Sequence, residues 1–223
     1  MIYLTKKIDV KTIFPLSLML VIPFFNAQAQ EAKDSSVVEP KNRFELIING
    51  KTYQAVEGQP LTLESTISKP SISIKLSDRK QFAAASLSFD YPRHLSFEYE
   101  KETGLKTWTL SGNHLVVTLF ELDGEIPLNT LIESIVEKFG KENCTVEDFK
   151  KEFGHQLTSG KRLHVKLAGT NLIIDFYALS SHDAKSRIIS FQDTIKDSGD
   201  SSDEFNAAFQ MINSSINLPS SPH

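Results

Sequence analysis

The stretch LVVTLFELDGEIPLNTLIESIVEKFG, residues 115–140, contains a clear strand pattern followed by a clear helix pattern. Its first part, Leu115–Phe120, is almost continuously apolar, which is typical of a central strand covered on both faces. Apolar side chains then recur at steps of three and four residues, at Leu128, Leu131, Ile132, Ile135 and Phe139. This period predicts an amphipathic helix, with Pro127 tolerated at its start and Gly140 at its end. The segment therefore combines a buried strand with a helix that covers it.

Upstream of this segment, apolar and polar residues alternate, which indicates strands with one buried face. The run Phe44–Tyr53 predicts two short strands joined at Asn49-Gly50, because both turn residues tolerate the positive φ of a type I′ hairpin. Two more half-buried strands, separated by a break at Lys69-Pro70, are expected at Leu61 and Leu63 and at Ile72, Ile74 and Leu76. Further strands are expected at Leu87–Tyr91, Leu95–Tyr99 and Thr107–Leu110.

Downstream, the sequence predicts three strands, at Leu163–Leu167, Leu172–Phe176 and Arg187–Phe191. A second helix is expected from Thr145 to Phe153, with a strand as the alternative for the same residues. The last helix is expected from Ser202 to Ile216, with a capping box formed by Ser201 and Glu204. The predicted class is therefore α+β: a mostly antiparallel sheet with a long helix after the central strands and a C-terminal helix packed on it.

Residues 1–29 have the features of a cleavable secretory signal peptide. Three lysines form a positively charged start, and the run Ile13–Phe25 that follows is apolar apart from one serine. Ala27-Gln28-Ala29 then matches the small-x-small pattern of a cleavage site, so we expect cleavage between Ala29 and Gln30. The apolar run is shorter than the roughly 20 residues of a transmembrane helix, which disfavours an uncleaved anchor. The product is expected to be exported, either periplasmic or secreted, with no stable membrane anchor after cleavage.

The rest of the chain is divided by composition. We expect a flexible leader at residues 30–42, an N-terminal β-hairpin region at 43–80, an α+β domain at 81–217 and a loose tail at 218–223. The whole chain has a net charge of −4, and loss of the signal peptide makes it more negative, so nucleic-acid binding is not expected. The single cysteine, Cys144, excludes an internal disulfide.

No motif for catalysis, for a cofactor or for a metal occurs, so we predict no catalytic, cofactor-binding or metal-binding residues. The histidines at positions 94, 114, 155, 164 and 182 are widely spread, with no ligand spacing among them. His164 alternates with apolar neighbours and is expected to face water. Acidic neighbours, Glu142, Glu147 and Asp148, should raise the pKa of the Cys144 thiol and make it a poor nucleophile.

Two other groups of residues have a functional and a structural interpretation. An acidic run could bind calcium, although its spacing is not that of an EF-hand and a solvated loop is favoured; it comprises Asp193, Asp197, Asp200, Asp203 and Glu204. An aromatic group could stack a sugar or a peptide if it were exposed, although a place in the core is favoured; it comprises Tyr91, Tyr99 and Trp108.

Over residues 86–216, the order of elements resembles the PsbP-like domain. The resemblance rests on the strand with FDYP, the strand TWTLSG, the long amphipathic helix, the hairpin GKRLHVKLAGTNLIIDFYAL and the helix FNAAFQMINSSI. It implies an antiparallel sheet with a closing helix, in a group whose members mostly bind partners.

Two functions from different classes follow as hypotheses. The first is an exported, non-enzymatic binding or accessory domain whose protein or small-ligand partner is unknown; as an accessory subunit, it should expose an apolar patch larger than a few hundred Å². The alternative is an extracytoplasmic hydrolase whose residues meet only in the folded chain. A pocket with two carboxylates, or with a histidine and a carboxylate, would favour the alternative.

Overall fold

The computed structural model describes residues 39–63, 69–167, 169–179 and 183–218. The expected signal peptide, the cleavage site at Ala29 and Gln30, most of the expected leader and most of the tail lie outside the described residues. Among the residues described, no helix is long and apolar enough to cross a membrane.

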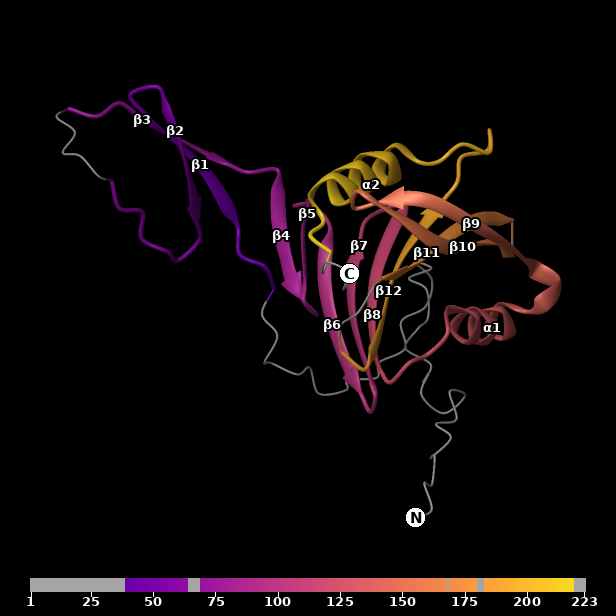
Figure 1. The fold of residues 1–223 in the computed structure, drawn as a ribbon. Helices are drawn as coiled ribbons and strands as arrows, with labels where there is room; N and C mark the ends of the chain where they lie inside the picture. The colour runs from indigo at the N-terminus through magenta and orange to yellow at the C-terminus, as the bar shows by residue number, and fades with distance from the viewer. Residues whose placement is uncertain (1–38, 64–68, 168, 180–182, 219–223) are drawn as a thin grey trace, which may run out of the picture.

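The body of the molecule is built on a seven-stranded antiparallel sheet with the order β6-β7-β8-β12-β11-β10-β9 (Figure 1). Its strands are β6 (Ser96–Glu102), β7 (Leu105–Ser111), β8 (Leu115–Asp123), β9 (Cys144–Phe153), β10 (Gln156–Leu167), β11 (Thr170–Leu179) and β12 (Lys185–Thr194). A separate hairpin is formed by β4 (Arg79–Ala84) and β5 (Leu87–Pro92). In the described part of the chain, the helices are α1 (Leu128–Phe139) and α2 (Asp203–Ser215), and a short 3₁₀ turn, η2 (Lys141–Asn143), precedes β9.

One apolar core lies on each face of the seven-stranded sheet, and each core is closed by one helix. On one face, α2 and the β4-β5 hairpin bury a core that includes Phe82, Tyr91, Trp108, Phe153, Tyr177, Phe191, Ala208 and Ile212. On the other face, α1 buries a core that includes Leu105, Phe120, Leu131, Ile132, Ile135, Leu163, Ile174 and Phe176. The body therefore has three layers, with the sheet in the middle.

Strand β8 has apolar side chains on both faces of the sheet. Leu115, Val117 and Leu119 point into the core under α2. Phe120 and Leu122 point into the core under α1. Both sets are almost completely buried, so the predicted central strand with two covered faces is confirmed. The predicted helix after it is also confirmed, and it ends at Gly140, whose φ of 87° is suited to glycine.

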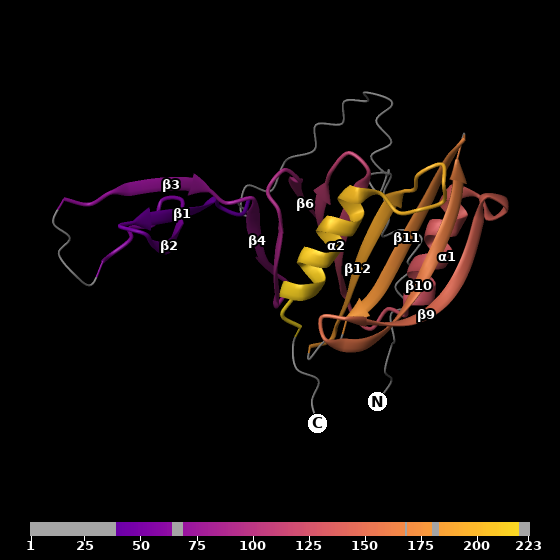
Figure 2. The ribbon, with the colours of Figure 1, turned by 90° about the horizontal axis from the view of Figure 1, so that it is seen from above.

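The first three strands form a sheet of their own, which we call the arm: β1 (Arg43–Ile48), β2 (Lys51–Val56) and β3 (Ile72–Leu76), in the order β2-β1-β3. The arm projects from one side of the body (Figure 2). Asn49 and Gly50 connect β1 to β2 with φ angles of 48° and 81°, so the predicted two-residue hairpin turn is confirmed.

Three expectations about secondary structure are wrong. The helix expected at residues 145–153 is wrong and its alternative, a strand, is confirmed, because each residue of Cys144–Phe153 pairs with β10. The expected strand at Leu61 and Leu63 is absent from these two residues. Ile72 and Ile74 do lie on a strand, but they are 56% and 66% exposed rather than half-buried, because β3 is the edge of the arm.

The expected α+β class holds at the level of a mostly antiparallel sheet with two helices. Strands outnumber helices so strongly, however, that the balance is that of a mainly β protein. Strand β4, which no sequence pattern predicted, adds to this balance by pairing with β5 along its whole length.

Candidate interaction surface

The alternation of strand residues sorts the arm into an apolar face and a polar face. Residues directly opposite each other in neighbouring strands share a face. The apolar face therefore includes Phe44, Leu46 and Ile48 of β1, Tyr53 and Ala55 of β2, and Ile72, Ile74 and Leu76 of β3. The opposite face includes Glu45 and Lys75, which lie directly across from each other.

The exposed part of the apolar face lies on β3. Ile48 is only 4% exposed, and Phe44 and Leu46 are partly buried. Ile72, Ile74 and Leu76 are instead 56%, 66% and 39% exposed. The exposed apolar surface of the arm is therefore concentrated along its edge strand β3. Single exposed apolar residues are common on protein surfaces, whereas neighbouring ones that form a patch indicate an interaction site.

The backbone of β3 is also open along this edge. The Asn49 N–H donates to the Ser71 carbonyl, and the Ser77 N–H donates to the Arg43 carbonyl. Because hydrogen bonds to one neighbour alternate along an antiparallel strand, the odd-numbered residues of β3 bond to β1. The even-numbered ones, which are the three apolar residues, direct their N–H and C=O groups outward. No other strand of the described chain pairs with this side.

The two edges of the body are protected in a way that β3 is not. Charged side chains on an edge strand discourage pairing with another chain. The edge strand β6 carries Glu98, Glu100, Lys101 and Glu102, and the edge strand β9 carries Glu147, Asp148, Lys150, Lys151 and Glu152. Strand β3, with the sequence ISIKL, has one charged residue, and it lies opposite Glu45. Among the described strands, β3 therefore has less of this protection than the two edges of the seven-stranded sheet.

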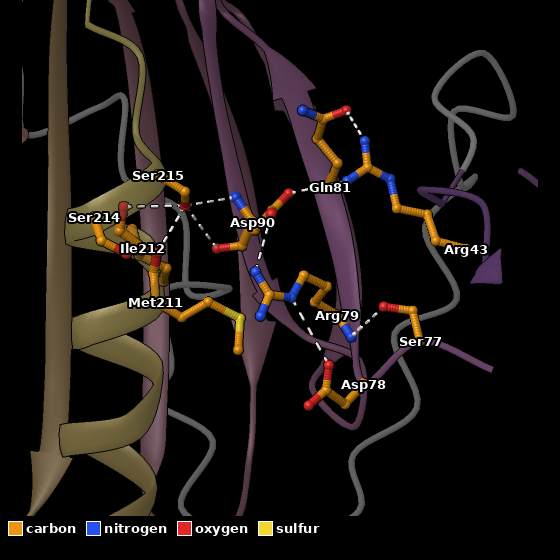
Figure 3. A network of polar contacts seen from close by, with 10 residues as sticks. All are labelled: Arg43, Ser77, Asp78, Arg79, Gln81, Asp90, Met211, Ile212, Ser214 and Ser215. Atoms are coloured by element: carbon orange, nitrogen blue, oxygen red, sulfur yellow. Dashed lines mark hydrogen bonds and ion pairs between the residues drawn. The ribbon is translucent and has the colours of Figure 1, made fainter. Parts of the chain in front are cut away.

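A charged network joins the arm to the body (Figure 3). Arg43 of β1 contacts the Asp90 carboxylate at 3.3 Å and donates to the Gln81 side-chain oxygen at 2.6 Å. Arg79 contacts the same carboxylate at 3.6 Å. The backbone N–H of Asp90 donates to the Ser215 hydroxyl at 2.9 Å, which connects β5 to the end of α2. Asp90 therefore links the root of the arm to both the hairpin and the C-terminal helix.

A second charged cluster lies inside the body, on the same sheet face as α2. Glu121 of β8 is flanked in register by Lys106 of β7 and Arg187 of β12. Its carboxylate accepts hydrogen bonds from Lys106 at 3.0 Å, Lys185 at 2.9 Å and Arg187 at 2.9 Å. Burial raises the pKa of Glu121, but these three donors outweigh burial and hold its pKa below the ordinary value. The cluster is a satisfied structural network.

The acidic run is divided among separate structural roles. Asp193 is buried and accepts the Ser202 N–H at 3.0 Å, whereas Asp197 and Asp200 are exposed. Lys196 pairs with Asp203 at 2.9 Å. No group of three possible metal ligands occurs among the described residues. The solvated-loop interpretation fits Asp197 and Asp200 but is wrong for Asp193, which is buried on β12.

The capping box predicted at the start of α2 is wrong by one residue. Ser202, not Ser201, is the N-cap, and its hydroxyl accepts the Phe205 N–H at 3.0 Å. Glu204 instead accepts the backbone N–H groups of His114 at 2.6 Å and Leu115 at 3.2 Å. Burial raises the pKa of Glu204, but these bonds and the contact with His94 outweigh it and lower the pKa.

The other sequence candidates do not meet in one site. His94 contacts Glu204 at 3.0 Å, while His155 lies near Glu152 at 3.9 Å. The His164 side chain is 39% exposed, which agrees with its predicted orientation, and His182 lies outside the described residues. Burial, and secondarily Glu142, raises the pKa of the Cys144 thiol. The pKa of Cys144 is raised, as expected, although burial contributes more to this shift than the acidic neighbour does.

The aromatic group is part of the core. Tyr91 is 0% and Trp108 5% exposed, and Tyr99 packs on Trp108 with their ring centroids 5.4 Å apart. The core interpretation is therefore correct for Tyr91 and Trp108, whereas Tyr99 is partly buried and packs against that core.

An open hollow of about 370 Å³ lies between α1 and the β9-β10 edge. Its lining includes apolar Ile132, Val136 and Val146, with Glu133, Glu137 and Lys161 among the charged residues. The two glutamates are the carboxylate pair that a hydrolase would need, but both are exposed to solvent. General acid catalysis at neutral pH requires a carboxyl group whose pKa is raised, usually by burial. The hollow does not supply this environment.

Comparison of the sequence with protein-family models and with curated proteins finds no match. The candidate surface therefore rests on the geometry of the arm alone. The sequence signal that could have revealed it is the combination of an apolar alternation at residues 72–76 with the near absence of charge there.

Proposed function

We propose that this chain is exported, to the periplasm or the exterior, and acts there as a non-enzymatic binding or accessory domain. The outer edge of β3 is the surface that binds its protein partner. One observation carries this proposal: Ile72, Ile74 and Leu76 combine exposed apolar side chains with outward-directed backbone groups. An extended segment added to such an edge gains main-chain hydrogen bonds and apolar contacts together.

The enclosed carboxylates favour binding over hydrolysis. A general acid or base works best when its pKa lies near the working pH. The pKa values of Glu121 and Glu204 are lowered instead, and each carboxylate bonds to several donors. The resemblance of residues 86–216 to the PsbP-like domain is part of the same proposal, and its support is the order of elements in the sequence.

The test is photo-cross-linking in the native host. A photoreactive amino acid at position 74 should give a cross-linked adduct in the exported fraction. The matched control is position 157, because Leu157 is also 66% exposed but lies on β10 of the body. Adding Ile72→Lys should suppress the adduct at position 74, since it places a charge beside the probe on the same edge. Equal adducts at both positions, or none at position 74, would overturn the proposal.

A further inference from the structure

We propose that the partner at this edge is a second copy of this chain, and that two β3 strands pair antiparallel about a two-fold axis at Ile74. The inference rests on the proposed function of the β3 edge and names its occupant. The two arms would then form one continuous sheet across the dimer.

The backbone geometry of β3 suits this pairing. With Ile74 opposite Ile74 of the second copy, Ile72 lies opposite Leu76 of that copy. All of these residues direct their N–H and C=O groups toward the free edge. Each facing pair can therefore exchange two hydrogen bonds, as in the hydrogen-bonded pairs of any antiparallel ladder. No residue within β3 would leave an outward-directed group unpaired.

The side chains suit it as well. A two-fold axis perpendicular to the sheet keeps the same face of both arms on the same side, so the contact is isologous. The apolar faces then meet, with Ile74 beside Ile74 of the second copy and Ile72 beside Leu76 of that copy. The exposed apolar surface of the arm is covered at the strand where it is most exposed.

The sequence disfavours the two neighbouring registers. Centring the pair on Ser73 places Leu76 opposite Pro70, which has no N–H to donate. Centring it on Lys75 places two lysines directly opposite each other, and like charges in that position are destabilising. In the register centred on Ile74, Lys75 faces Ser73 of the second copy and keeps Glu45 on its other side. One register therefore satisfies both the hydrogen bonds and the charges.

The arm is a small sheet, so pairing with a second arm would stabilise it. A sheet of three short strands with one apolar face is close to the lower limit for independent stability. Pairing two arms doubles the number of strands and joins their apolar faces. A second copy has the same sequence, the same open β3 edge and the same apolar face. The two edges are therefore complementary to each other without any further feature.

The register can be tested with two single-cysteine variants of the mature chain, Ser73→Cys and Lys75→Cys, each in a Cys144→Ser background. The proposed register brings position 73 of one copy opposite position 75 of the other in a non-hydrogen-bonded pair. Their Cα atoms would be about 4.5 Å apart, which a disulfide can bridge. Under mild oxidation, the mixture should give about tenfold more disulfide dimer than either variant alone.

Sedimentation of the cysteine-free chain provides the second measurement. It should show a dimer that Ile74→Lys converts to a monomer and that Leu157→Lys leaves intact, with circular dichroism confirming that both variants are folded. Equal cross-linking in the mixture and in the single variants, or a monomer at all concentrations, would overturn the second copy as partner. If a monomer still gave an adduct with a different protein at position 74 in the host, the proposed function would stand and this inference would fail. Absence of any adduct would overturn both.

Discussion

Ile74 of β3 lies directly opposite Leu46 of β1, yet Ile74 is 66% exposed while Leu46 is partly buried. The two side chains share one face of the arm, so their difference comes from position in the sheet. Leu46 has a strand on each side, whereas Ile74 pairs with a strand on one side only among the residues that the structure describes. The surface available for binding therefore follows the edge of the arm.

Ile48→Ala should loosen the arm without loosening the body. Ile48 is 4% exposed, and removing a buried isoleucine side chain to alanine costs about 2–4 kcal/mol. Native-state hydrogen exchange should show faster exchange for the amides of β1 and β2 and unchanged exchange for those of β8 and β12. Ile47→Ala, on the opposite face of the same strand, should have a smaller effect. Equal acceleration in the arm and the body would show that the two sheets unfold together.

Asp90→Asn should release the root of the arm. The substitution removes the charge that holds Arg43 and Arg79, whose contacts are 3.3 Å and 3.6 Å long. Trypsin should then cleave faster after Lys75 or Arg79, because the connection between β3 and β4 opens more often. The matched control is Asp78→Asn, since this carboxylate is 82% exposed and contacts Arg79 at 3.8 Å. Cleavage at the same rate in both variants would contradict a special role for Asp90.

Glu121→Gln should destabilise the body by about 3 kcal/mol, because it leaves Arg187 buried without its charged partner on β8. Chemical denaturation measures this loss as a shift in the unfolding midpoint. Asp183→Asn removes another carboxylate that contacts Arg187, but its side chain is 48% exposed, so the loss should stay within about 1 kcal/mol. A smaller loss for Glu121→Gln than for Asp183→Asn would overturn this assignment.

Stability should fall in acid. The pKa values of Glu121 and Glu204 are lowered from 4.5 in the folded protein, so the unfolded chain takes up protons first as the pH falls. The contribution of these groups is therefore fully present above about 4.5 and is lost as the pH falls through their folded values. Thermal midpoints measured from pH 7 to pH 3 should decrease, and the decrease should be shallower in Glu121→Gln. A parallel decrease in both proteins would contradict the role of Glu121.

Export predicts a defined amino terminus. Mass spectrometry of the chain recovered from the exported fraction should find Gln30 as the first residue, because Ala27-Gln28-Ala29 matches a signal-peptidase site. An intact Met1 in that fraction would contradict the prediction of cleavage.

Local sequence patterns predicted the elements whose apolar period is strong. The helix at residues 128–139 and the two-sided burial of β8 both follow from side chains that repeat over many residues. The region 145–153 was ambiguous because Phe149, Phe153 and Gly154 also fit a short capped helix. The ladder to β10, which no local pattern reveals, decides for a strand.

Exposure and charge pairing could not be predicted in the same way. An alternation such as that of Ile72 and Ile74 is the same whether a strand lies inside a sheet or at its edge. The network at the root of the arm joins Arg43 to Asp90, which are 47 residues apart, and the internal cluster joins Glu121 to Arg187, which are 66 residues apart. Such partners become visible only when the strand order and register are known.

Amide hydrogen exchange along β3, measured at several concentrations of the mature chain, shows directly whether the outer edge of β3 is paired. The amides of Ser73 and Lys75 bond to β1 and should be protected at every concentration. Those of Ile72, Ile74 and Leu76 face the free edge, so they should be protected only where β3 is paired. These three amides should gain protection together as concentration rises and should lose it in Ile74→Lys. Rapid exchange of all three at every concentration would contradict this pairing.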